Sequence, residues 1–192
     1  MFAGHAGAGA PTILVFGDSL SAGYGIDVDR SWTALLQQRL EDQGYEHRVV
    51  NASISGETTA GGAARIDSAL ETFRPALVVV ELGGNDGLRG FPPEQVQANL
   101  EKIVATSLAA GARVVVLGIR IPTNYGLRYR TAFEAVFRDL AKTYDVPWIE
   151  FFLAGVADDE SLMQGDGIHP TAAAQPLLLD NAWPVIRTAL DG

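Results

Sequence analysis

The sequence predicts an α/β fold in which helices cover both faces of a five-stranded parallel sheet, a three-layer α/β/α sandwich. Short β-branched runs alternate with helical patterns along the chain. The runs 77–80 and 114–117 are apolar at every position, which is typical of strands buried on both faces. No internal repeat or linker divides the 192 residues, so we expect a flexible segment over residues 1–10 and one domain over residues 11–192.

The elements of the first part of the chain follow from apolar runs and their boundaries. Residues 12–16 are apolar and predict the first strand. Ser31 suits the N-cap of a helix that Gly44 ends, and its apolar residues recur at helical spacing. Residues 48–51 predict the second strand. Residues 58–73 predict a looser helix, weakened by two adjacent glycines.

The rest of the chain repeats this alternation. Strands are expected over residues 76–82, 112–119 and 146–151. Pro93 suits the first turn of a helix between the first two of them. Two further helices are expected over residues 129–144 and 171–190. The last should be interrupted near Pro184, because proline lacks an N–H.

Composition excludes several classes of function. The chain carries 14 Lys and Arg against 23 Asp and Glu, a net charge of −9, which argues against binding nucleic acid or anionic membranes by charge. It has no cysteine, so disulfides, thiolate metal sites and cysteine nucleophiles are excluded. No apolar run approaches the ~20 residues of a membrane span, so stable membrane insertion is not expected. The first ten residues lack the regions of a signal peptide.

Glycines and small polar residues gather in the segments that follow the expected strands. In a parallel sheet these segments meet at one edge, where ligands bind. They read GDSLSAGYG (17–25), NASISGETT (51–59), ELGGNDGLRGF (81–91), RIPTNYG (120–126) and QGDGIHP (164–170).

One of the three histidines is a good candidate for a general base. His5 lies in the N-terminal segment and His47 precedes a strand, whereas His169 lies in a loop at the expected functional edge. Asp166, three residues earlier, can accept a hydrogen bond from the Nδ1–H of His169 and leave Nε2 free to take a proton. The alternative is that Asp166 caps a helix near Thr171 and that His169 is an incidental loop residue.

The other loops offer a nucleophile and hydrogen-bond donors. Ser19 follows the first strand, and a base such as His169 would activate its hydroxyl. The Asn85 side chain and the backbone N–H groups of Gly56 and Ser19 can stabilise an oxyanion. Each residue alone has an ordinary explanation as a cap or turn residue. Their coincidence in the post-strand loops favours an acyl-transfer site.

These segments resemble the conserved blocks of the SGNH (GDSL) hydrolases. Gly17-Asp18-Ser19-Leu20 resembles the first block, Gly56 the second, Gly83-x-Asn85-Asp86 the third and Asp166-x-x-His169 the last. The strings NASISGET and VELGGNDGLRGF resemble the bacterial branch that includes acyl-CoA thioesterase I, lysophospholipase L1 and arylesterase. The resemblance implies the flavodoxin-like SGNH hydrolase fold.

The resemblance also implies roles. Ser19 is then the nucleophile, His169 the general base and acid, and Asp166 the carboxylate that orients it. Ser19, Gly56 and Asn85 form the oxyanion hole. The implied reaction hydrolyses esters or thioesters of acyl chains through an acyl-enzyme, with no metal or cofactor. A monomer acting on small acyl substrates in the periplasm or outside the cell is expected.

Further residues are expected to line the substrate site. They are Asp18, Leu20, Leu88, Phe91, Ile121 and Pro122. Asp18 is also expected to brace neighbouring loops. Gly87 and Gly90 bracket Leu88, so this segment suits a mobile lid over the acyl chain, although it also fits a simple lead-in to the helix at Pro93.

Three alternatives remain open at this point. The same blocks serve short-chain or carbohydrate acetylesterases. A phosphate-binding, flavodoxin-like module would use GDSLSAGYG as a cradle, but this segment lacks both G-x-G-x-x-G and a Walker lysine. A non-enzymatic binding protein would have no need of Ser19, Asp166 and His169.

Overall fold

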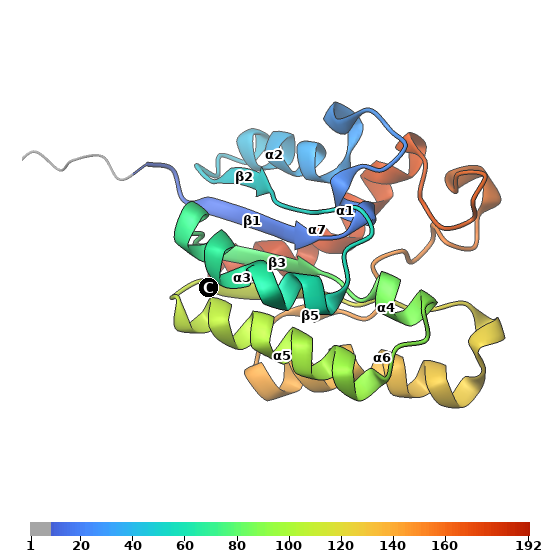
Figure 1. Cartoon of the computed structure of the whole chain (residues 1–192). Helices are drawn as coiled ribbons and strands as arrows, with labels where there is room; N and C mark the ends of the chain where they lie inside the picture. The colour runs from blue at the N-terminus through green and yellow to red at the C-terminus, as the bar shows by residue number, and fades with distance from the viewer. Residues whose placement is uncertain (1–8) are drawn as a thin grey trace, which may run out of the picture.

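A computed structural model describes residues 9–192, and it contains one five-stranded sheet in the order β2-β1-β3-β4-β5 (Figure 1). All neighbouring strands are parallel. The strands are β1 (Thr12–Gly17), β2 (Arg48–Asn51), β3 (Leu77–Glu81), β4 (Arg113–Leu117) and β5 (Trp148–Ile149). Most of the expected N-terminal segment lies outside the described residues; Gly9 and Ala10 are exposed and have no regular secondary structure.

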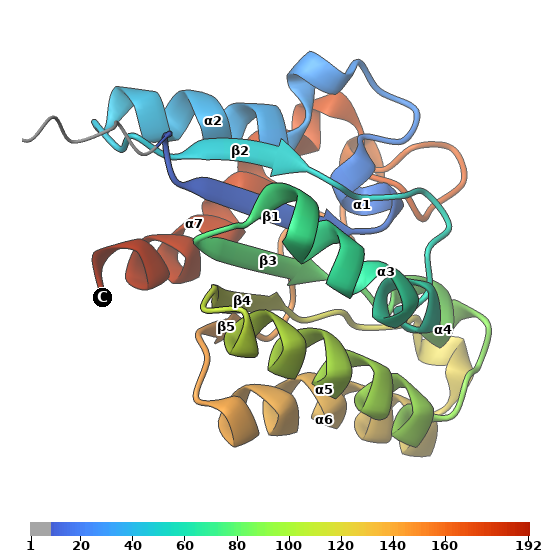
Figure 2. The same cartoon turned by 60° about the vertical axis from the view of Figure 1, so that its left-hand side comes forward.

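Helices cover both faces of the sheet, which confirms the predicted three-layer α/β/α class. Helices α2 and α7 lie on one face, and α3, α5 and α6 on the other (Figures 1 and 2). The α-helices are α1 (Ser19–Ala22), α2 (Trp32–Asp42), α3 (Thr59–Phe73), α4 (Gly84–Leu88), α5 (Pro93–Ala109), α6 (Leu127–Tyr144) and α7 (Gln175–Asp191). Short 3-10 turns are η1 (Val28–Arg30), η2 (Thr123–Tyr125), η3 (Glu160–Leu162) and η4 (Ala172–Ala174).

The central strands form the core. Every residue of β3 is buried, as are all but the first residues of β1 and β4, as their apolar runs predict. The edge strands β2 and β5 have no fully buried residue. The two central strands that carry functional loops, β1 and β3, are therefore held on both faces and along both edges.

Local sequence explains the main helices. The Ser31 side chain accepts a hydrogen bond from the Ala34 N–H and caps α2, and Thr58 caps α3 in the same way through the Gly61 N–H. The paired glycines do not break α3. A Cβ at Gly62 would lie 2.6 Å from Leu82 Cδ1, so this glycine lets the helix approach the sheet closely.

Two expectations were wrong in extent. The fifth strand is two residues long rather than six, and it begins just after Pro147, which has no N–H to donate to a ladder. Helix α7 continues through Pro184 without interruption. Buried residues on both sides of this proline, such as Trp183 and Ile186, pack on the same core. This packing offsets the loss of the hydrogen bond that residue 184 would donate to the Asp180 carbonyl.

The strand order sets the position of the site. The chain moves from β1 outward to β2 and then crosses back to β3 on the other side of β1, so the order reverses between β1 and β3. In open α/β sheets, ligands bind at the carboxyl ends of strands at such a switch point. The loops after β1 and β3, which carry Ser19 and Asn85, meet there.

Candidate active site

Ser19 begins the short helix α1 directly after β1. Asp18 caps this helix: its Oδ1 accepts a hydrogen bond from the Leu20 N–H at 3.1 Å. Gly23, in the left-handed conformation, ends the helix after Ala22. The turn leaves Ser19 half-buried, with its hydroxyl at the end of the sheet.

The loop after η3 brings an imidazole to Ser19. His169 Nε2 lies 2.8 Å from Ser19 Oγ, and His169 Nδ1 lies 2.6 Å from Asp166 Oδ2. Asp166 Oδ1 also accepts hydrogen bonds from the backbone N–H groups of Ile168 and His169. Asp166 does not cap the following turn, whose N-cap is Thr171. The structure thus brings Ser19, His169 and Asp166 together in a hydrogen-bonded chain.

Asp166 is held in its charged form. The hydrogen bond from the His169 side chain, followed by those from the His169 and Ile168 N–H groups, lowers the pKa of Asp166 to about 2. A permanent carboxylate at Nδ1 fixes the tautomer in which Nε2 can accept a proton from Ser19.

The three expected oxyanion donors border the same corner. Asn85, in α4, donates from Nδ2 to Asp18 Oδ2 at 3.1 Å and to the Glu57 carbonyl at 2.9 Å. Gly56 is exposed with a φ of +80°, a conformation that favours glycine. Among residues 9–192, no acceptor is found for the N–H of Gly56 or of Ser19. Both backbone donors are therefore available to a ligand.

Two carboxyl groups lie buried beside helix α1, a pairing that the sequence reasoning missed. Asp18 and Glu81 are 1% and 0% exposed. Glu81 Oε2 accepts a hydrogen bond from Ser21 Oγ at 2.7 Å, whereas its Oε1 is buried with no partner among the described residues. The sequence did contain one indication of it: Glu81 directly follows the apolar run 77–80, which is typical of a strand buried on both faces.

Burial shifts both groups toward the neutral form. Desolvation raises the pKa of Asp18 to about 6, opposed by hydrogen bonds from the Leu20 N–H and the Asn85 side chain and by the charge of His169. Desolvation, then the charge of Asp18, raises the pKa of Glu81 well above its ordinary value. Asp18 thus braces Leu20 and Asn85, as expected, and its burial leaves it little surface for the substrate contact that was also expected.

The segment expected to form a lid is tied down on both sides. Asp86, buried in α4, accepts hydrogen bonds from the N–H and hydroxyl of Thr59 at the start of α3. Tyr125 Oη donates to the Leu88 carbonyl at 2.7 Å, and Tyr129 Oη donates to the Phe91 carbonyl at 2.6 Å. Neither tyrosine is among the six residues expected to line the substrate site. Tyr125 follows the sequence IPTN, and Tyr129 is the first residue of the expected helix 129–144.

The expected substrate-lining residues differ in exposure. Leu88 and Phe91 are partly buried, and Pro122 is exposed. Ile121 and Leu20 are buried, and Ile121 Cγ2 packs against Gly87, where a side chain would not fit. Gly87 is therefore a packing position, and Gly90, with a φ of +68°, is the better candidate for a hinge.

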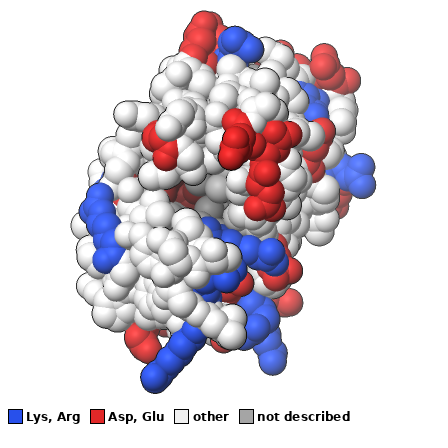
Figure 3. Space-filling view, turned by 90° about the vertical axis from the view of Figure 1, so that its right-hand side faces the viewer, with Lys and Arg blue, Asp and Glu red and all other residues white. Residues whose placement is uncertain are grey.

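The face at the ends of the strands is hollowed near its centre (Figure 3). Acidic side chains gather on one side of this hollow and basic side chains on the other. Among residues 9–192, no cluster of three His, Asp or Glu side chains is arranged to hold a metal ion. None of the helices described is long and apolar enough to cross a membrane.

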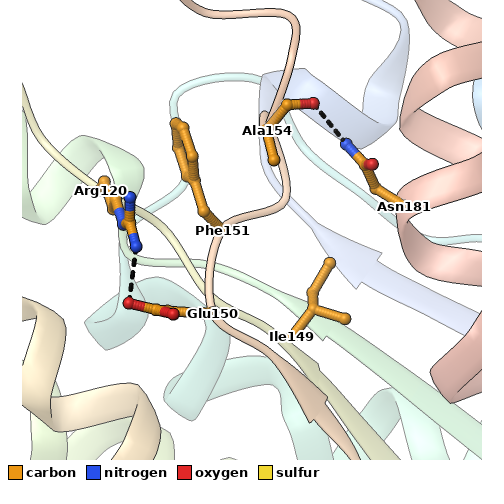
Figure 4. Close-up of a pocket in the computed structure, with 6 residues that line it drawn as sticks. All are labelled: Arg120, Ile149, Glu150, Phe151, Ala154 and Asn181. Atoms are coloured by element: carbon orange, nitrogen blue, oxygen red, sulfur yellow. Dashed lines mark hydrogen bonds and ion pairs between the residues drawn. The ribbon is translucent and has the colours of Figure 1, made fainter.

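A pocket of about 280 Å³ lies after β4 and β5 (Figure 4). It is lined by Arg120, Ile149, Glu150, Phe151, Ala154 and Asn181. Its polar groups already pair with each other: Arg120 donates to Glu150, and Asn181 donates to the Ala154 carbonyl (Figure 4). It contains no member of the Ser19 constellation.

The sequence matches the model of the GDSL-like Lipase/Acylhydrolase family over residues 15–176. It is 53% identical over 183 residues to esterase TesA of Pseudomonas aeruginosa, covering 95% of this chain and 91% of that protein. It is 47% identical over 173 residues to thioesterase 1/protease 1/lysophospholipase L1 of Escherichia coli K12, covering 90% and 82% of the two chains.

A solved structure has the same architecture. The psychrotrophic esterase EstA from Pseudoalteromonas sp., in a form inhibited by monoethylphosphonate, superposes with a TM-score of 0.89 at 41% identity. The superposition covers 94% of this chain and 99% of that chain.

Proposed function

Because this chain belongs to the GDSL-like lipase and acylhydrolase family, we propose that Ser19, His169 and Asp166 carry out its hydrolysis of carboxylic esters and thioesters. The observation that carries the assignment is the continuous chain of hydrogen bonds from Asp166 through His169 to Ser19 Oγ. It holds a base within proton-transfer distance of the only atom in the constellation that can form an acyl-enzyme.

The first half-reaction uses this chain directly. Ser19 Oγ attacks the acyl carbonyl and gives its proton to His169 Nε2, and the charged Asp166 stabilises the imidazolium. Collapse of the tetrahedral intermediate breaks the bond to the alcohol or thiol, and His169 returns the proton to that leaving group. In the second half-reaction His169 Nε2 takes a proton from water while the water oxygen attacks the acyl carbonyl. Collapse of this second intermediate breaks the bond between the acyl group and Ser19 Oγ, His169 returns the proton to Ser19 Oγ, and the carboxylic acid leaves.

The oxyanion is stabilised by donors from three loops. The N–H groups of Ser19 and Gly56 have no acceptor within the described part of the chain, and Asn85 Nδ2 supplies the third donor. Asn85 uses both of its N–H groups in the resting structure, on Asp18 and on Glu57. One of these bonds must lengthen or be shared as the oxyanion forms.

The substrates are esters and thioesters of acyl chains, the class named for the relatives. We assign the acyl chain to the side of Leu88, Phe91 and Pro122, whose surfaces remain accessible beside α4. The leaving group then departs on the side of His169, which must protonate it.

The experiment is active-site labelling combined with a substrate panel. Wild type should react with a fluorophosphonate at Ser19 and hydrolyse p-nitrophenyl esters from acetate to palmitate and acyl-CoAs. Ser19→Ala should lose both labelling and turnover. Labelling of another residue, or turnover by Ser19→Ala, would remove Ser19 from the mechanism. Activity that is highest with the acetate ester and is lost as the acyl chain lengthens would favour an acetylesterase instead.

Location and assembly complete the proposal. A periplasmic or secreted monomer fits the resemblance of the sequence to its bacterial branch. Fractionation of cells that express the natural gene, followed by light scattering of the purified protein, tests both properties. Recovery in the cytoplasm or as a stable dimer would contradict them.

A further inference from the structure

Tyr24 is a large side chain that stays exposed beside the nucleophile. It follows α1, and 51% of its surface is accessible. Its ring centroid nevertheless lies 4.4 Å from that of His169, with the two planes inclined by 36°. An exposed aromatic ring is thus in face contact with the imidazole that also contacts Ser19.

The contact with Tyr24 restrains the face of the His169 imidazole, which its hydrogen bonds do not contact. Hydrogen bonds to Asp166 and Ser19 hold Nδ1 and Nε2, the two polar edges of the ring. Both bonds lie in the plane of the imidazole, so they oppose rocking of the ring out of that plane least. Contact with one face opposes that rocking. The contact matters because the side chain of Asp166 is itself 39% exposed.

A second side chain fixes the loop that carries Tyr24. Gln164 Nε2 donates to the Tyr24 carbonyl at 2.8 Å and to the Pro170 carbonyl at 2.9 Å. The Gln164 N–H donates to the His169 carbonyl at 2.7 Å. Gln164 therefore ties the Tyr24 loop to the backbone of His169 and Pro170.

Gly25 permits this close approach. It has a φ of +72°, and a Cβ at this position would collide with the Gln164 side chain. The ring contact, the Gln164 bridge and Gly25 together place the Tyr24 ring against His169.

We propose that Tyr24 is a positioning residue that holds the His169 imidazole in register with Ser19 through both half-reactions. Each half-reaction passes through a protonated His169, and the face of an aromatic ring attracts a cation. The proposal rests on the proposed function, because it assigns Tyr24 a role in the proton transfers of His169.

Pre-steady-state kinetics on Tyr24 variants tests it. With p-nitrophenyl butyrate, the burst reports acylation and the steady state reports deacylation. Tyr24→Ala should slow both steps roughly two- to twelvefold, the rate equivalent of one aromatic contact. Tyr24→Phe, which keeps the ring, should stay within about twofold of wild type in both. The melting temperature of both variants should match that of wild type, because the side chain is exposed.

Two controls make the result specific. Val28→Ala removes another exposed apolar side chain, 58% accessible in η1, and should leave both steps unchanged. Tyr24→Leu keeps apolar bulk without an aromatic face and should behave like Tyr24→Ala.

Several outcomes would overturn the inference. If only acylation slows, Tyr24 contacts the leaving group, because that group is absent during deacylation. If Tyr24→Phe is as slow as Tyr24→Ala, the hydroxyl acts rather than the ring. Unchanged kinetics in Tyr24→Ala would also reject it. The variant Ser19→Ala separates failure of this inference from failure of the proposed function. If the proposed function were wrong, Ser19→Ala would keep the wild-type burst.

Discussion

Gly17 occupies a position at the end of β1 that has no room for a side chain. A Cβ there would lie 2.8 Å from Glu81 Oε2 and 2.9 Å from Ser21 Oγ. Gly17→Ala should therefore displace α1, which carries Ser19, and destabilise the fold by about 1–3 kcal/mol, the usual cost of overpacking. Urea unfolding measures the loss, and fluorophosphonate labelling should slow in the folded variant. Gly165→Ala, where nothing lies within 4 Å, is the control and should change neither.

Asn85 is the side-chain donor of the proposed oxyanion hole. Asn85→Ala should lower kcat by roughly 10²–10³ with a smaller change in KM, as expected for the loss of one preorganised donor. Asn181→Ala is the matched control, because Asn181 also donates to two carbonyls, those of Phe152 and Ala154, but lies away from Ser19. It should lower the melting temperature while kcat stays near wild type. Equal kcat values for the two variants would remove Asn85 from the mechanism.

The sequence allowed the candidate site residues that lie within motifs to be predicted. It did not allow the burial of the Glu81 carboxyl group to be predicted. Ser19, Asn85 and the Asp166–His169 pair were identified because post-strand loops carry few reactive side chains. Their catalytic roles stay predictions until the variants are measured. Glu81 was missed because a carboxyl group at the end of a strand usually faces solvent. Only the close pairing of β1 with β3 shows that it faces Gly17.

At the scale of elements, η2 and α6 hold the segment after α4. The hydroxyls of Tyr125 and Tyr129 bond the carbonyls of Leu88 and Phe91. The double variant Tyr125→Phe/Tyr129→Phe should release this segment and raise KM for a long-chain p-nitrophenyl ester roughly 5- to 150-fold, at about 0.5–1.5 kcal/mol for each hydrogen bond.

Comparing esters of short and long acyl chains separates loss of acyl-chain binding from a general loss of activity in the double variant. Hydrolysis of p-nitrophenyl acetate by the double variant should stay near wild type, because the acetyl group does not reach the segment. Tyr144→Phe, at the last residue of α6, is the control. A loss of activity that is equal for acetate and palmitate esters would contradict a role in holding the acyl chain.

The ends of helices could be predicted from the sequence where interactions between residues close in the chain determine them. Ser31 and Thr58 mark the starts of α2 and α3 because capping involves residues close in sequence. The extent of β5 and the continuity of α7 through Pro184 depend on tertiary partners instead. The short helices α1 and α4 were not predicted, since four and five residues give no periodic pattern.

At the scale of the whole molecule, the buried carboxyl groups should make stability depend on pH. A folded-state pKa above the ordinary value favours the fold while the group is protonated. That stability is fully present below the unfolded pKa, 4.5 for Glu81, and is lost as pH rises through the folded value. Wild type should therefore melt at a lower temperature at about pH 8 than at about pH 5.

Glu81→Gln should flatten this dependence, because an amide of similar shape has no proton to lose. Differential scanning fluorimetry from about pH 5 to about pH 8 measures the slope. Asp18, with a pKa of about 6, leaves a residual slope near that pH in the variant. Exposed Glu71→Gln is the control and should keep the wild-type slope. An unchanged slope in Glu81→Gln would show that Glu81 does not bind a proton on folding.

The strand order also has a consequence for the timing of biosynthesis. The proposed nucleophile, Ser19, follows the first strand, the proposed oxyanion donors Gly56 and Asn85 follow the second and third, and the proposed base comes at residue 169 of 192. Domains fold as the chain leaves the ribosome from its N-terminus. A growing polypeptide therefore carries Ser19 for most of its synthesis without His169, the base proposed to activate it. Hydrolytic activity can begin only after nearly the whole chain has been made.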